Sequence, residues 1–203
     1  MKEARPIRRT RWLATLALAA AVPAAAAGPG APPDNPAIDV TAHLCVAAEA
    51  ARHREARRID EDTFIRLSPT GRPGRECRSA QRGGRPASRE PGTAVLAARR
   101  RERHDALHVR GAVNLPFPGI TAGRLAQLVP DRGTRILVCC NNDFTGARAP
   151  FPTKLPSASL NLSTFAALYD YGYRNVYELR PLLDARTTRI ALAGTLAAAV
   201  RAR

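Results

Sequence analysis

Cys140 stands where the sequence predicts a reactive thiol. It ends the segment 135–140, whose apolar residues 136–140 have the composition of a buried strand, and the polar positions 141–143 follow it directly. In open α/β sheets, ligands bind at the carboxyl ends of the strands. A helical pattern that starts near Ser159 would direct its N-terminal amides towards this loop, and such amides stabilise a thiolate. We therefore predict that Cys140 is a nucleophile, and the alternative is an inert buried thiol.

The other three cysteines have different expected roles. Cys139 precedes Cys140 on the strand, and neighbouring strand residues face opposite sides of a sheet. We expect Cys139 to be a core residue that does not bridge to Cys140. Cys45 and Cys77 then remain as a plausible structural disulfide, because an even number of cysteines in an exported chain suggests bridging.

The start of the chain predicts export. A basic segment precedes an apolar stretch at 12–22, and Ala25-Ala26-Ala27 offers a cleavage site, so residues 1–27 are interpreted as a secretory signal peptide. The apolar stretch is shorter than the roughly 20 residues of a spanning helix, so we expect no stable membrane span. The predicted location is secreted or periplasmic.

After the signal, the pattern predicts one α/β domain with short extensions. Residues 28–41 are rich in Pro and Gly and predict a disordered leader, and 42–57 have apolar residues at helical spacing. Short strands and helices then alternate over 58–184, with an irregular insert at 69–92. The alanine-rich segment 185–203 predicts a C-terminal helix. Such alternation favours a parallel sheet with helices on both faces.

Three segments, in this order, resemble the rhodanese family. They are residues 108–116 (HVRGAVNLP), the strand that ends at Cys140 together with the helix after it, and residues 172–179 (GYRNVYEL). The resemblance covers 58–184. It implies a rhodanese-like three-layer α/β domain with a central, mainly parallel five-stranded sheet flanked by helices.

The resemblance also implies sulfur transfer. In active members, the cysteine that matches Cys140 takes a sulfane sulfur from a small donor such as thiosulfate, holds it as a persulfide and passes it to a thiol or cyanide-like acceptor. Loop amides and a helix end would stabilise the anion, and no cofactor is implied. The predicted substrate-binding residues are Asn141, Asn142, Asp143, Phe144, Thr145, Gly146 and Arg148, and Lys154 is a further candidate for an anionic donor.

Two departures from the family keep other functions open. Ala97 stands where members usually have Asp, and the segment from Cys140 to Ser159 spans 20 residues, whereas the family loop is short. The main alternative is a non-catalytic rhodanese-like binding module of the periplasm. A cysteine phosphatase or arsenate reductase would need an arginine clamp at C-x5-R. Gly146 occupies that position and Arg148 lies two residues later, which disfavours this class.

The net charge of +15 has a compositional explanation. Lys2 and Lys154 are the only lysines among the 32 basic residues, which indicates codon bias, and no block of stacking aromatics lies among the arginines. We therefore expect no nucleic-acid binding. His43, His53 and His104 lack metal-ligand spacing, so we predict no metal site. We expect a monomer.

Two further polar residues close to the predicted strands receive structural roles. We expect His108 to satisfy backbone groups at its turn and not to act on the thiol. We expect Arg99 to belong to a solvated helix start, although its place at a strand end could bring it to the site.

Overall fold

The computed structural model describes residues 35–69 and 92–202. The predicted signal peptide, most of the predicted leader, most of the insert at 69–92 and Cys77 lie outside the described residues. The export signal and the Cys45–Cys77 disulfide therefore stay predictions. The helices, strands and site discussed below belong to one compact unit, Asp39–Arg203.

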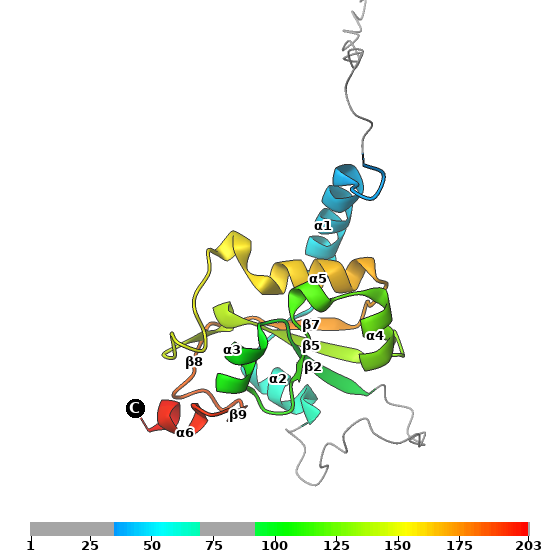
Figure 1. Ribbon diagram of the computed structural model, residues 1–203. Coiled ribbons are helices and arrows are strands. Elements are labelled where there is room, and N and C mark those ends of the chain that lie inside the picture. Colours follow the sequence, from blue (N-terminus) through cyan, green and yellow to red (C-terminus); the bar gives the residue numbers. More distant parts are fainter. Residues whose placement is uncertain (1–34, 70–91, 203) are drawn as a thin grey trace, which may run out of the picture. The chain divides into compact units, whose positions relative to one another are not determined.

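A five-stranded parallel sheet forms the centre of this unit (Figure 1). Its strands, in spatial order, are β1 (Arg58–Ile59), β7 (Val176–Leu179), β5 (Arg135–Cys139), β2 (Thr93–Ala97) and β4 (Val113–Asn114). Every neighbouring pair in this sheet is parallel. The predicted α/β class with a central parallel five-stranded sheet is confirmed.

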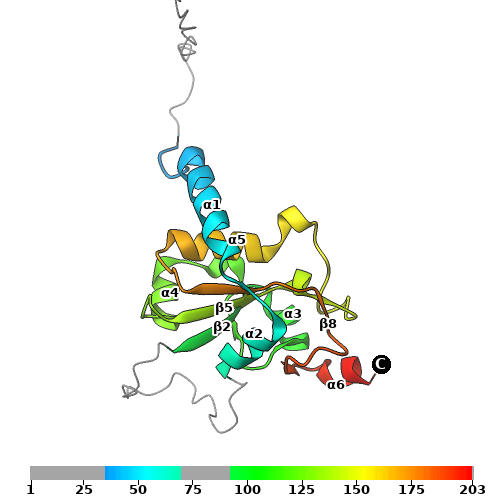
Figure 2. The same ribbon diagram turned by 180° about the vertical axis from the view of Figure 1, so that it is seen from behind.

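Helices cover both faces of the sheet, as the alternation of strands and helices predicts (Figures 1 and 2). The helices are α1 (Val40–Glu55), α2 (Glu61–Leu67), α3 (Arg101–Ala106), α4 (Ala122–Leu128), α5 (Leu160–Asp170) and α6 (Ala197–Arg201). Single turns of 3-10 helix lie at η2 (Phe117–Gly119), η3 (Asn141–Asp143) and η4 (Pro156–Ala158). The helices α1, α4 and α5 contribute to one hydrophobic cluster, and α2 contributes to the other.

The central strand β5 divides its side chains between these two clusters. Ile136 and Val138 pack with the cluster that contains α5, and Leu137 and Cys139 pack with the opposite cluster. This is the ordinary two-residue alternation of a strand. The next residue, Cys140, therefore returns to the α5 side, and the vicinal cysteines belong to different layers.

The predicted C-terminal helix at 185–203 is wrong over most of its length. Among its described residues, 185–202, only α6 is helical. The chain before it forms β8 (Leu183–Asp184), which pairs with β6 (Phe144–Thr145), and β9 (Leu192–Ala193), which pairs with β3 (His108–Val109). Ile190 and Leu192 bury their side chains in the core, which outweighs the helix propensity of the neighbouring alanines. A Cβ at Gly194 would lie 2.6 Å from the Ala106 carbonyl oxygen, so the return of the chain needs a glycine.

Candidate functional site

Cys140 lies immediately after β5, at the carboxyl end of the central strand, and precedes η3. The thiol of the preceding residue, Cys139, is fully buried on the other face of the sheet, and burial raises the pKa of Cys139 to about 12. The prediction that Cys139 is a core residue is confirmed. Of the two neighbouring thiols, Cys140 is the one that meets polar groups.

Those polar groups come from the loop and from the start of α5. The Asn142 amide donates to the Cys140 sulfur at 3.3 Å, and the Ser159 hydroxyl lies 3.4 Å from the same sulfur. Ser159 is the N-cap residue of α5, and the Asn161 amide in its first turn also interacts with the sulfur. These donors and the helix N-terminus favour negative charge on sulfur.

Burial opposes this effect. Cys140 is only 2% exposed, and burial raises the pKa of its thiol, with the nearby charge of Asp143 as the second cause. The hydrogen bonds from Ser159, Asn142 and Asn161 lower the pKa but do not reverse the direction. The resting thiol is therefore protonated at neutral pH.

Asp143 is the buried acid of the site. Its Oδ2 accepts from the Cys140 backbone N–H at 2.6 Å, and the Asn161 side-chain amide donates to Oδ1 and Oδ2 at 3.0 and 3.1 Å. Burial raises the pKa of Asp143 to about 7 in spite of these hydrogen bonds. The carboxyl group is thus near its midpoint at neutral pH, and its charge acts on the neighbouring thiol.

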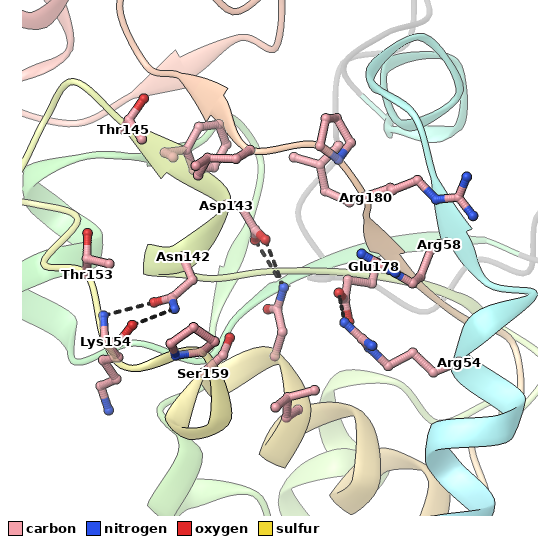
Figure 3. A pocket seen from close by; sticks show the side chains of 17 residues that line it. Arg54, Arg58, Asn142, Asp143, Thr145, Thr153, Lys154, Ser159, Glu178 and Arg180 are labelled. Carbon is pink, nitrogen blue, oxygen red and sulfur yellow. Dashed lines mark hydrogen bonds and ion pairs between the residues drawn. The ribbon is translucent and has the colours of Figure 1, made fainter.

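A pocket of about 410 Å³ lies beside these residues (Figure 3). Asn142, Asp143, Ser159 and Asn161 line it, but Cys140 does not. The groups that contact the sulfur are therefore also the pocket wall. The polar groups therefore lie between the sulfur and the cavity.

An ion pair forms part of the far wall of the pocket. Arg54 of α1 donates through Nε to Glu178 of β7 at 2.5 Å and through its terminal nitrogen to the second carboxylate oxygen (Figure 3). The Glu178 side chain is 5% exposed and that of Arg54 is 18% exposed. The hydrogen bond to Glu178 raises the pKa of the Arg54 guanidinium. This pair attaches α1 to the edge of the site.

Sequence reasoning did not find these pocket residues. Arg54, Arg58, Glu178 and Arg180 line the pocket, although they lie far from Cys140 in sequence. One signal was available, because Glu178 interrupts an apolar strand, and a buried carboxylate needs a cationic partner. The identity of that partner depends on the packing of α1 and could not be predicted.

The structure brings some of the predicted substrate-binding residues together and separates others. Asp143, Phe144 and Thr145 line the pocket with Asn142, whose side chain bonds the Lys154 backbone at 2.9 and 3.1 Å. Lys154 lines the pocket as well. The remaining predicted residues do not line it. Asn141 is buried, and Gly146 and Arg148 are both exposed.

The long loop explains this separation. After η3 the chain does not turn around the sulfur but pairs as β6 with β8, and Phe144 stacks on Phe151 in the core at 4.8 Å. Within the predicted cradle 141–146, the Asn142 amide donates to the sulfur at 3.3 Å, and the Asp143 amide forms a capping box with the Cys140 side chain. Arg148 is exposed two residues beyond Gly146, so it supplies no arginine clamp to the pocket.

The expectation for Arg99 was wrong and that for His108 is confirmed. Arg99 is 3% exposed, and its guanidinium donates to the Pro150 and Leu107 carbonyl oxygens at 2.9 and 2.6 Å. It also stacks over the Phe151 ring at 4.5 Å, so it anchors the loop from within. The His108 Nδ1 donates to the His104 carbonyl oxygen at 2.7 Å and serves the backbone, as predicted.

Neither a metal cluster nor a spanning helix is found in the part of the chain that the structure describes. Within residues 35–69 and 92–202, no three His, Cys, Asp or Glu side chains gather closely enough to hold a metal ion. No helix in the same ranges has both the length and the apolar character needed to cross a membrane.

Several solved structures resemble this chain. Rhodanese from E. coli is 22% identical to this chain, and the matched region covers 51% of this chain and 99% of the rhodanese chain, with a TM-score of 0.35. The rhodanese-like domain of an Anabaena protein is 15% identical over 69% of this chain and 80% of its own, with a TM-score of 0.42. A thiosulfate sulfurtransferase from Pseudomonas aeruginosa is 15% identical over 79% of this chain and 22% of its own, with a TM-score of 0.36.

No protein-family model and no curated protein matches the chain. The fold is defined by the parallel five-stranded sheet, with helices on both faces and a cysteine at the end of the central strand. The solved structures to which the chain is similar are rhodaneses and rhodanese-like domains, the family that the three segments resemble.

Proposed function

We propose that this protein is a sulfurtransferase in which Cys140 carries the transferred sulfur as a persulfide. One observation carries the proposal. The Cys140 sulfur accepts hydrogen bonds at the N-terminus of an 11-residue helix, beside a pocket with basic residues in its wall. Hydrogen bonds and a helix N-terminus that favour negative charge on sulfur, next to a cavity with basic residues in its wall, support an anionic sulfur donor.

The reaction with thiosulfate is a simple displacement. The Cys140 thiolate attacks the outer sulfur of thiosulfate, the bond between the two thiosulfate sulfurs breaks, and sulfite leaves with the electron pair. Cys140 then carries a persulfide anion. An acceptor such as a thiolate or cyanide attacks the outer sulfur of this persulfide and restores the Cys140 thiolate.

The burial of Cys140 determines how the reaction begins. Because the pKa of the thiol is raised, the reactive thiolate is a minority at neutral pH, and the rate should rise as pH increases. The Ser159 side chain lies between the sulfur and the pocket and must move aside when the donor approaches. The donor anion would then replace the hydroxyl as the neighbour of sulfur.

A second candidate function is a non-catalytic binding module, which the same burial favours. A thiol that is 2% exposed with a raised pKa is poorly placed for rapid attack. In this alternative the pocket binds an anionic ligand, and Cys140 is a packing residue. We propose a secreted or periplasmic location for either function, on the basis of the signal sequence at 1–27.

Incubation with thiosulfate separates the two candidates. We expect the wild-type chain to acquire one cyanide-labile sulfur on Cys140, located by peptide mass spectrometry. Cys140→Ser should abolish the modification, and Cys139→Ser is the matched control that removes a neighbouring buried thiol and should retain it. A folded wild-type protein that acquires no sulfur would favour the binding module.

A further inference from the structure

We propose that the stacked rings of His104 and His108 form a pH switch that controls how firmly the C-terminal segment, residues 193–202, is bound to the domain. The segment is bound at neutral pH, and protonation of both rings in acid loosens it. The switch is independent of sulfur transfer by Cys140. It follows from the geometry of the two rings, from their hydrogen bonds and from the backbone contacts that the chain between them makes with the segment.

The two rings lie face to face at the end of α3. Their centroids are 4.0 Å apart, with an angle of 10° between the ring planes. His104 is 9% exposed and His108 is partly buried, so water screens the rings only in part. Two imidazolium charges this close repel each other, because Coulomb repulsion grows as distance and screening decrease. The pair therefore accommodates one proton and opposes a second.

The hydrogen bonds of the two rings differ in the ring protons that they need. The His104 Nδ1 lies 3.2 Å from the Asp105 carboxylate, and its Nε2 lies 3.2 Å from the Ala112 carbonyl oxygen. Both partners only accept hydrogen bonds, so the ring makes both bonds together only when it is protonated. The His108 Nδ1 donates to the His104 carbonyl oxygen at 2.7 Å, which a neutral ring can do. Within the described part of the chain, the His108 Nε2 has no acceptor for a further proton.

The charges near His108 also oppose a second proton. Burial lowers the pKa of His108 below its ordinary value of 6.5, and the charges of His104 and Arg99 lower it further. The bond to the His104 backbone and the charge of Asp105 raise the pKa but do not reverse the direction. Arg101 of α3 lies 3.4 Å from the same carboxylate and neutralises part of it. The His108 ring is therefore neutral at pH 7.

The elements on the other side of the pair, each within the described residues, carry no acidic side chain. β9 is Leu192–Ala193, α6 has Arg201 as its charged residue, and Arg110 is the charged residue of the turn after β3. Because the pKa of His108 is lowered in the folded chain, a chain whose pair has opened takes up a proton first as pH falls. The stability that the pair contributes is fully present above about pH 6.5 and is lost as pH falls below this value.

The chain between the two histidines supports the C-terminal segment. β3 and β9 are antiparallel, with His108 opposite Ala193. Beyond β9, the amides of residues 195–196 donate to the carbonyl oxygens of residues 105–106 at 3.0 and 2.9 Å. The α6 helix that follows has five residues, and none of them is buried. Elements with few buried contacts open at low cost, so a shift of the chain between the histidines weakens the binding of this segment.

Hydrogen exchange of the full chain, measured by mass spectrometry, tests the switch. Exchange of the C-terminal segment is measured at pH 8 and pH 5 and divided by the exchange of unfolded peptides, which removes the intrinsic effect of pH on amide exchange. We expect the segment to lose protection at pH 5, whereas the amides of β5 in the centre of the sheet keep theirs. Equal protection of the segment at both pH values would overturn the proposal.

Substitutions assign the effect to the histidine pair. His108→Gln removes the second charge, while the amide of the glutamine can still donate to the His104 carbonyl oxygen, so this variant should not lose protection at pH 5. His43→Gln, which removes an exposed histidine of α1 outside the pair, is the matched control and should lose protection as the wild type does. A His108→Gln chain that loses as much protection as the wild type would contradict the role of the pair.

An NMR titration of the histidine rings uses the wild-type chain and does not depend on the folding of a variant. The coupled pair should show two apparent midpoints, and the lower one should lie below the ordinary value of 6.5. Two midpoints at or above 6.5 would show that the folded pair accepts the second proton without resistance, and the switch would then be refuted.

Discussion

Asp143→Asn removes the buried carboxyl group next to Cys140 and should change how stability depends on pH. The pKa of Asp143 is about 7 in the folded protein against an ordinary value of 3.8, so between these values the folded state binds a proton that the unfolded state has lost. Stability is therefore lost as pH rises towards 7. Between pH 5 and pH 8 the loss is about 3 kcal/mol, at about 1.4 kcal/mol per pKa unit over about two units.

The assay is urea unfolding of the wild type and the variant at pH 5 and pH 8. The wild type should lose stability over this interval relative to Asp143→Asn, because the asparagine stays neutral. The side-chain oxygen of the introduced asparagine can still accept from the Cys140 N–H, and the Asn161 amide can rotate to offer its own oxygen. Asp184→Asn is the matched control, since the pKa of Asp184 is lowered to about 2 by Arg186 and it does not titrate in this interval.

The same substitution should make Cys140 more reactive. The charge of Asp143 raises the pKa of the thiol, so its removal should lower the pH midpoint of Cys140 alkylation, measured on the peptide that contains it.

If the variant and the wild type show the same change in unfolding free energy between pH 5 and pH 8, the carboxyl group is ionised throughout this interval. The reasoning about burial would then be refuted.

Three further predictions concern the pocket wall and the export signal. Arg54→Met should lower the unfolding free energy by about 3 kcal/mol, which is the low end for a broken buried ion pair because Arg54 is 18% exposed. Adding Glu178→Gln should restore part of this stability, because the remaining carboxylate is then neutral. A loss below about 1 kcal/mol in thermal or urea unfolding would count against the pair. Ser159→Ala should raise the pKa of the Cys140 thiol and move its alkylation midpoint to higher pH, and a midpoint that moves lower would show that the hydroxyl does not stabilise the thiolate. Mass spectrometry of the exported protein should find Gly28 as the first residue, and a retained Met1 would contradict cleavage.

Much of the fold could be predicted from local pattern. The run at 136–140 is continuous and apolar, so it indicated a buried strand, and the two-residue alternation placed Cys139 and Cys140 on different faces. Asp60 and Thr121 have side chains typical of helix caps, and both accept from backbone amides in the structure. These features depend on neighbours in sequence, which is why sequence reasoning reached them.

The missed features depend on contacts between distant segments. The alanine-rich C-terminal segment has high helix propensity, but pairing of β9 with β3 and burial of Ile190 determine its structure. The sequence around Arg99 is typical of the start of a charged helix, yet carbonyl oxygens at Pro150 and Leu107 bind its guanidinium inside the protein. The pocket wall from α1 and from Arg180 could not be predicted, because no local pattern indicates which helix packs on which strand.

The location of the transferred sulfur tests the central claim most directly. Peptide mass spectrometry of the wild-type chain after thiosulfate treatment should find one additional sulfur on Cys140, removable by cyanide, with the modification increasing in rate as pH rises. An unmodified Cys140 in protein that unfolds cooperatively, or an additional sulfur that persists in Cys140→Ser, would contradict the assignment of this thiol as the sulfur carrier.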